Sequence, residues 1–208
     1  MQHRPMAATA AMLADPARAA MVLALMDGRS RCAKKLALDA GVTPQTASAH
    51  LRKLVAANLL VSQSSGRMKY FSLAGAEVAQ AVEALSEIGN HSLRPAAEEL
   101  RFARCCYDHL AGQLGVSVTE RLLQPGNPIL ANLGIDLAAL ESARRPLFRC
   151  CTDWTERRPH IAGALGAALL HHYKEQRWLA TVQDSRKLVV TPLGSQMFAR
   201  VFGIECAA

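Results

Sequence analysis

The residues best able to bind a metal or react chemically are thiols, with neighbouring imidazole and carboxylate groups, in two short segments: Cys105, Cys106 and His109 in the first, and Cys150, Cys151 and Asp153 in the second. Thiolate sulfur and imidazole nitrogen are preferred ligands of soft and borderline divalent metals. Apolar spacing predicts a helix over about residues 95–114, on which Cys105 and His109 lie four positions apart. Brought together, one thiol of the first pair, Cys151, His109 and Asp153 predict a site for Zn, Cd or Pb.

The same thiols allow other interpretations. Three arginines, Arg149, Arg157 and Arg158, lie near the second pair, and positive charge lowers a thiol pKa and favours reaction with oxidants or electrophiles. In another interpretation, one cysteine of each pair fills the core and the other is incidental. In a further one, an apolar pocket binds a small-molecule effector. A Cys–His–Asp enzyme is the rival function. We expect no enzyme, because the sequence has no Gly-x-Ser-x-Gly motif and no phosphate-binding glycine loop.

Composition limits the class of protein that must position these groups. The chain has 208 residues, 50% of them hydrophobic and 20% charged, which suits one or two globular domains. Its net charge of +7 permits binding to a polyanion. The sequence has neither the roughly 20-residue apolar run of a membrane-spanning helix nor the apolar core of a signal peptide. We therefore expect a mostly α-helical cytoplasmic protein with reduced cysteines and no membrane partner.

The first segment has the pattern of a helix-turn-helix. Apolar residues at helical spacing predict a helix over about residues 12–26, with Asp15 as a cap near its start. A short helix over about residues 32–40 follows, and Gly41 makes a tight turn. Thr43 then caps a third helix. Two helices joined by a glycine turn, the second of them capped, are typical of a DNA-binding unit.

The outer face of the third helix is polar and then basic, and carries Gln45, Thr46, Ser48, Ala49, Arg52 and Lys53. Short polar groups near the start of a helix can match base edges in the major groove, and arginine and lysine further along can meet phosphates. No acidic residue occurs between Thr43 and Leu60. The sequence therefore predicts double-stranded DNA as a partner.

A β-hairpin is predicted directly after this helix. Residues 61–73 alternate in character around the turn Ser64-Ser65-Gly66, and the returning strand carries Arg67 and Lys69 on one side. A basic two-stranded ribbon beside a recognition helix is typical of a wing that contacts the minor groove or the backbone. The helix that follows, over residues 76–88, has an apolar stripe suited to a partner subunit.

Three stretches resemble the ArsR (SmtB/ArsR) family of bacterial winged-helix repressors: residues 13–18, the helix-turn-helix at 35–60, and the wing at 66–73. Together they span about residues 10–90. The resemblance implies a homodimer on palindromic operator DNA that an effector releases. By position, it also implies that Thr43 and His50 join the polar residues of the outer face in the groove, and that Arg67 is the wing contact. For His50 the alternative role is that of a packing residue at the helix interface.

Two metal sites known in that family are incomplete here. Members that sense arsenite or zinc through the helix before the recognition helix carry a Cys-x-Cys pair there, where this chain has only Cys32. A cadmium- and lead-sensing branch is similar across the first segment, but Lys53 and Ala57 replace its recognition-helix cysteines. Metal sensing in this chain would therefore depend on the thiols of the second half.

The second half resembles a degenerate copy of the first. A shift that places residues 60–62 over residues 179–181 aligns helix end, strand, polar turn, strand and helix. Residues 160–177 then take the recognition-helix position, but they are small and apolar, which suits dimer contacts or effector binding. We expect a winged helix-turn-helix for DNA binding and dimerisation at 1–92, and a helical, winged-helix-like effector or dimerisation domain at 93–208.

Overall fold

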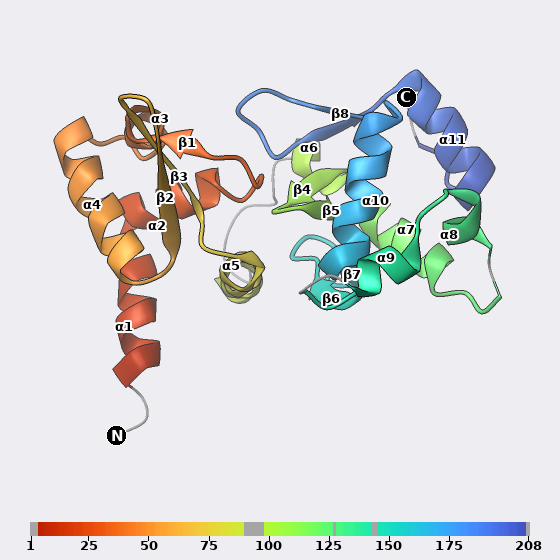
Figure 1. The fold of residues 1–208 in the computed structure, drawn as a ribbon, viewed down its shortest axis with the longest axis horizontal. Helices are drawn as coiled ribbons and strands as arrows, with labels where there is room; N and C mark the ends of the chain where they lie inside the picture. Colours follow the sequence, from red (N-terminus) through yellow and green to blue (C-terminus); the bar gives the residue numbers. More distant parts are fainter. Residues whose placement is uncertain (1–3, 90–97, 127, 143–144, 207–208) are drawn as a thin grey trace. The chain divides into compact units, whose positions relative to one another are not determined.

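The computed structural model describes residues 4–89, 98–126, 128–142 and 145–206. The chain forms two compact units, Met1–Val82 and Glu83–Ala208. Helices and short antiparallel hairpins make up both units (Figure 1), which confirms the predicted fold class. Among the described residues, no single helix is long and apolar enough to cross a membrane; Met6–Leu13 and Pro16–Ala24 pass that test only as a pair, with an 86° bend between them.

The first unit contains the predicted helix-turn-helix and wing. Its elements are α1 (Arg4–Leu13), α2 (Pro16–Ala24), β1 (Arg31–Cys32), α3 (Ala33–Asp39), α4 (Pro44–Ala56), β2 (Leu60–Ser65) and β3 (Met68–Leu73), with α5 (Ala76–Gly89) running across the boundary of the units. The predicted cap Asp15 is confirmed, because its carboxylate accepts the Arg18 N–H at 3.0 Å. This cap separates α2 from α1. The helix is shorter than the predicted 12–26, since residues 12–13 belong to α1 and α2 ends at Ala24.

Apolar side chains from the helices and the sheet form the core of the first unit. Met21 of α2, Leu36 of α3, and Leu51 and Leu54 of α4 are fully or almost fully buried. The strands pair in the order β1-β3-β2. Ser65 pairs with Met68, so the turn lies later than predicted, and Arg67 is at the tip of the wing rather than in the returning strand.

The second unit is built from short hairpins and helices. Its elements are α6 (Glu98–Arg101), β4 (Arg104–Cys106), β5 (His109–Ala111), α7 (Gln113–Leu122), α8 (Ile129–Asn132), α9 (Leu137–Glu141), β6 (Arg149–Thr152), β7 (Pro159–Ala162), α10 (Gly163–Glu175), β8 (Leu179–Thr181), β9 (Leu188–Val190) and α11 (Pro192–Phe202). Its core centres on α10 and aromatic side chains such as Tyr173, Trp178 and Phe198.

The helix predicted over about residues 95–114 is wrong; residues 95–97 lie outside the described part of the chain. In its place, β4 and β5 form a hairpin, followed by α7. Gly112 explains the break, because its φ of 84° is a conformation that side chains disfavour. A Cβ there would also lie 2.5 Å from the Arg101 carbonyl oxygen. The backbone therefore turns sharply at Gly112.

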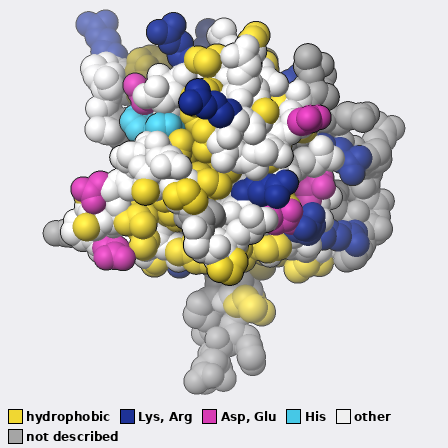
Figure 2. Space-filling model, turned by 90° about the vertical axis from the view of Figure 1, so that its right-hand side faces the viewer, with side chains coloured by type: hydrophobic (Ala, Val, Ile, Leu, Met, Phe, Trp, Pro, Cys, Tyr) yellow, Lys and Arg dark blue, Asp and Glu magenta, His cyan; other side chains and the backbone are white. Residues whose placement is uncertain are grey.

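The predicted order of helix, hairpin and helix in the second half is present as α10, β8–β9 and α11. The helix begins at Gly163 rather than at residue 160, because His160 belongs to β7. Leu165, Leu169 and Leu170 of α10 are buried in the core of the unit itself. On the face in Figure 2, groups of hydrophobic side chains lie among scattered basic and acidic ones, so this face is not uniformly basic.

Candidate nucleic-acid interface and candidate metal centre

The exposed face of α4 carries most of the residues predicted to contact DNA. Exposed side chains are those of Thr43, Gln45, Thr46, Ser48, Arg52 and Lys53, while Ala49 is half-buried. Thr43 caps the helix by accepting the Thr46 N–H at 3.2 Å. Ala47, Leu51 and Leu54 bury the opposite face. The helix therefore presents hydroxyl and amide groups at its N-terminal end and positive charge further along.

His50 lies on α4, but its side chain points toward the start of α2. Its Nδ1 atom is 3.4 Å from an Arg18 guanidinium nitrogen and 3.9 Å from the Asp15 carboxylate, and the ring is largely covered. Arg18 also donates to the carbonyl oxygens of Ala11 and Met12 at the end of α1. The ring therefore contacts the junction between α1 and α2.

The wing adds two exposed basic side chains beyond α4. Arg67 lies in the turn between β2 and β3, and Lys69 follows on β3. The Lys69 ammonium lies 5.7 Å from the centre of the Phe71 ring, a cation–π contact that favours one position of the side chain. Both groups thus extend the positive charge of the α4 face onto a hairpin.

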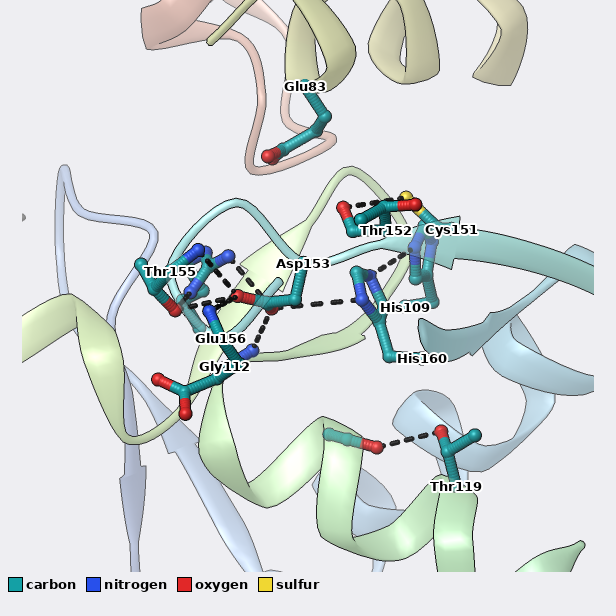
Figure 3. A network of polar contacts seen from close by, with 12 residues as sticks. Glu83, His109, Gly112, Thr119, Cys151, Thr152, Asp153, Thr155, Glu156 and His160 are labelled. Atoms are coloured by element: carbon teal, nitrogen blue, oxygen red, sulfur yellow. Dashed lines mark hydrogen bonds and ion pairs between the residues drawn. The ribbon is translucent and has the colours of Figure 1, made fainter. Parts of the chain in front are cut away.

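Four side chains from the two hairpins β4–β5 and β6–β7 meet in a buried cluster: Cys106, His109, Cys151 and His160. One sulfur or ring nitrogen from each lies within 4.8 Å of the other three. Figure 3 shows His109, His160 and Cys151 side by side, and the two histidine Nε2 atoms are 3.2 Å apart. Two sulfurs and two nitrogens that converge in this way are a tetrahedral zinc donor set. The residues therefore fit a soft or borderline divalent cation.

A carboxylate lies beside the outer nitrogen of each histidine. Asp108 Oδ1 is 3.2 Å from His109 Nδ1, and Asp153 Oδ2 is 3.7 Å from His160 Nδ1. Carboxylates in this position commonly fix the ring orientation of metal-bound histidine. The hydrogen bond with Asp108 orients the His109 ring in this way, and the Nε2 atoms of both rings face the cluster.

The two histidines hold protons differently. Burial disfavours a charged His109, but the hydrogen bond with Asp108 raises the pKa of His109 to about 9. Burial, with the nearby His109 charge, lowers the pKa of His160 to about 3. At neutral pH one ring of the pair is therefore protonated and the other is neutral, and one proton must leave before both can bind a metal.

The cluster thiols are shielded rather than reactive. Both are buried, and the hydrogen bond with Cys151 together with burial raises the pKa of Cys106 well above its ordinary value. Since the thiolate is the reactive form, this environment suppresses attack on electrophiles. A metal ion would likewise have to displace the Cys106 proton before it could bind there.

Three predicted members of the metal site lie elsewhere. Cys105 is in the core, where its thiol contacts the Tyr107 carbonyl oxygen at 3.1 Å, and Cys150 is exposed on β6. Asp153 is fully buried in an ion pair with Arg104 at 2.9 Å. Although burial raises the pKa of a carboxyl group, Arg104 holds the pKa of Asp153 well below its usual range. Asp153 therefore flanks the cluster instead of joining it.

The prediction missed His160 as the fourth cluster residue. The sequence does contain a signal for it, since Cys-Cys-x-Asp precedes a His-x-Ala-Gly segment twice in the second half. The first instance includes His109 and the second includes His160. Comparison of these two segments pairs the histidines directly.

Comparison with known proteins supports the helix-turn-helix of the first unit. A helix-turn-helix domain family matches residues 13–63. The chain is 37% identical to YdfF of Bacillus subtilis, an uncharacterised HTH-type transcriptional regulator, over 93% of this chain and 95% of that protein. Because this match covers both units, the likeness is not confined to the DNA-binding segment.

Solved structures similar to the chain cover less of it. One is the winged helix-turn-helix domain of Mb0332 from Mycobacterium bovis, at 24% identity, with 42% of this chain and 80% of that chain covered and a TM-score of 0.39. Another is the cadmium sensor CMTR of Mycobacterium tuberculosis, at 30% identity, with 45% and 92% covered and a TM-score of 0.35. On the full-length match to YdfF, the chain belongs to the HTH-type transcriptional regulators, as its resemblance to the ArsR family predicts.

Proposed function

We propose that this protein is a homodimeric cytoplasmic repressor that binds operator DNA through α4 and the wing and leaves it when the second unit binds an effector. The observation that carries the DNA-binding part is the capped α4 helix, with a buried apolar face and an exposed face that is polar and then basic. Such a helix can enter the major groove with its N-terminal end toward the bases. Arg67 and Lys69 would then reach the neighbouring backbone or minor groove.

A dimer is proposed from the apolar surface of α5. Leu85 and Ile88 on this helix are 51% and 70% exposed. Burying such side chains against a second copy is favourable, and two recognition helices would then read two half-sites. Sedimentation of the purified chain, compared with its L85E/I88E variant, tests this: the variant should be monomeric and should bind a single half-site only.

We propose a soft divalent metal ion, Zn²⁺, Cd²⁺ or Pb²⁺, as the effector, bound by Cys106, His109, Cys151 and His160. Their convergence supports this ligand class, and the raised pKa of Cys106 disfavours a thiol-reactive species as the ligand of this cluster. Four protein ligands complete a tetrahedral site and leave no position for a substrate, which supports sensing rather than catalysis. Binding need only favour one dimer geometry by about 1–3 kcal/mol to release DNA.

Gel shifts with DNA from upstream of the protein's own gene test the DNA-binding part. Salt-sensitive, sequence-specific binding is expected, and Arg52→Ala and Arg67→Ala should each weaken it. Arg200→Ala is the matched control, because it removes one exposed positive charge from α11. Equal effects of all three substitutions would contradict the assignment. Release by zinc, cadmium or lead in the same assay tests the effector, and release by an oxidant or an apolar ligand alone would replace the metal.

A further inference from the structure

The four cluster residues come from two copies of one sequence pattern. Residues 104–116 read RCCYDHLAGQLGV, and residues 149–167 read RCCTDWTERRPHIAGALGA. Both contain Arg-Cys-Cys-x-Asp and then His-x-Ala-Gly-x-Leu-Gly, with Trp-Thr-Glu-Arg-Arg-Pro inserted between these parts in the second copy. Each copy therefore supplies one cluster cysteine and one cluster histidine.

The two copies also have the same order of secondary-structure elements. In each copy a hairpin leads through a glycine into a helix: β4–β5, Gly112 and α7 in the first, and β6–β7, Gly163 and α10 in the second. The two glycines have φ angles of 84° and 85°.

The same backbone hydrogen bond follows each of these glycines. The Leu114 N–H donates to the Phe102 carbonyl at 2.9 Å, and the Leu165 N–H donates to the Leu147 carbonyl at 2.9 Å. These atoms occupy equivalent positions in the two sequences. The copies therefore share one local fold, and the resemblance is not limited to residue types.

The two copies pack against each other reciprocally. Helix α10 of the second copy packs on β5 of the first, α7 of the first packs on β7 of the second, and β5 contacts β7. The cluster lies where the strands meet, with the Nε2 atoms of His109 and His160 facing each other. Equivalent carboxylates, Asp108 and Asp153, flank the outer nitrogens of the two rings.

We propose that one zinc-type dication links the two copies, each copy providing half of a closed Cys₂His₂ site. This inference rests on the proposed function, which assigns the metal to the same four side chains. Two thiolates with two imidazoles suit the tetrahedral ions Zn²⁺ and Cd²⁺, whereas two sulfurs alone would not complete such a site. Bound there, the ion joins β4–β5 to β6–β7 and stabilises the packing of the whole second unit.

A titration of the metal-free full-length chain with Co²⁺ tests the coordination without DNA. We expect one Co²⁺ per chain, with tetrahedral ligand-field bands and thiolate charge-transfer absorption, and displacement by Zn²⁺. Octahedral bands, the lack of charge-transfer absorption, or two ions per chain would overturn the site. Thermal unfolding of the same samples should show a higher Tm with Zn²⁺ than without it.

Conservative substitutions test whether the two copies contribute equally to the metal site. Cys106→Ser and Cys151→Ser should each remove about half of the charge-transfer absorption and weaken Zn²⁺ binding by more than about 100-fold, a larger effect than loss of an outer-shell group. Cys150→Ser is the control, because Cys150 is the exposed neighbour of Cys151 on the same strand. Loss of binding in the control, or in only one of the two ligand variants, would contradict a shared site.

Failure of this inference and failure of the proposed function give different results. If Co²⁺ and Zn²⁺ bind as expected but operator affinity does not change with metal, the ion is a structural link and the effector is another ligand. If metal releases DNA while the cobalt spectra show no thiolate, the regulator senses metal at a different place and the shared site is wrong.

Discussion

The Nε2 atoms of His109 and His160 lie 3.2 Å apart although 50 residues separate the two histidines in the chain. Two nitrogens about 2.0–2.1 Å from one tetrahedral ion would lie roughly 3.3 Å from each other. The rings therefore already have the separation that a shared zinc ion requires. Their strands belong to different hairpins, so binding of an ion there connects two parts of the second unit.

Metal response should depend on the cluster cysteines, whereas metal-free DNA binding should not. We predict that Cys106→Ser and Cys151→Ser leave operator affinity of the metal-free protein nearly unchanged and abolish release by the metal. Gel shifts with increasing metal concentration measure this, with Cys150→Ser as the control that releases normally. Full release of both cluster variants by the metal would show that another site senses it.

Metal affinity should fall as the pH decreases. His109, with its pKa of about 9, is protonated at neutral pH, and a metal must displace that proton as well as those of the thiols. Calorimetric titrations with Zn²⁺ in two buffers of different ionisation enthalpy count the released protons. Asp108→Asn removes the carboxylate that raises the His109 pKa, so near pH 8 it should release fewer protons. An unchanged count would show that Asp108 does not control this ring.

The sequence predicts the fold of the first unit better than that of the second. The helix-turn-helix and the wing follow from local signals, because Asp15 and Thr43 are caps whose contacts the structure confirms. His50 shows a limit of that approach: its position on the helix surface does not reveal that the ring contacts Arg18, 32 residues earlier.

The metal cluster was predictable in composition but not in geometry. Three of its residues, Cys106, His109 and Cys151, were among the predicted ligands. The predicted helical setting of Cys106 and His109 is wrong, because short apolar runs fit a helix and a buried strand equally well. Non-local packing of β5 against β7, which belong to separate sheets, then brings His160 rather than Asp153 into the cluster, and spacing along one element cannot show such a contact.

The buried ion pair of Asp153 and Arg104 should be essential for stability. Neither side chain is exposed, and the Asp153 carboxylate also accepts the Gly112 N–H at 2.6 Å. Asp153→Ala would leave the Arg104 guanidinium buried without its partner, so we predict a loss of about 3–5 kcal/mol in the free energy of unfolding. Urea unfolding measures this. Asp136→Ala, which removes only the exposed cap of α9, should cost about 1 kcal/mol.

The same pair makes stability depend on pH in a defined direction. Since Arg104 lowers the pKa of folded Asp153 below the unfolded value of about 3.9, its contribution is fully present above about pH 5 and is lost as the pH falls below the unfolded pKa. Unfolding followed from pH 6 down to pH 3 should show a smaller pH dependence in Asp153→Ala than in the wild type. Identical pH dependence would mean that Asp153 is not the titrating group.

The two repeat glycines should be equally intolerant of a side chain. Both have positive φ, and a Cβ would lie 2.5 Å from a backbone oxygen at Gly112 and 2.8 Å from one at Gly163. We predict that Gly112→Ala and Gly163→Ala each destabilise the protein by more than about 2 kcal/mol. Gly126→Ala is the matched control, because Gly126 has a φ of 75° but open space around it. Similar losses in all three variants would assign the effect to backbone conformation alone.

Different residues of α4 should control the recognition of DNA sequence and the general affinity for DNA. Gln45, exposed in the first turn, can pair with the edge of a base, whereas Arg52, two turns later, lies where phosphates would be met. Gln45→Ala should therefore reduce the preference for operator over scrambled DNA by about 1–3 kcal/mol, with an unchanged salt dependence. Arg52→Ala should weaken binding to both duplexes similarly and reduce the salt slope by about 1. Fluorescence anisotropy with both duplexes at several salt concentrations distinguishes these effects, and a reversed pattern would mean that α4 lies in the groove in another orientation.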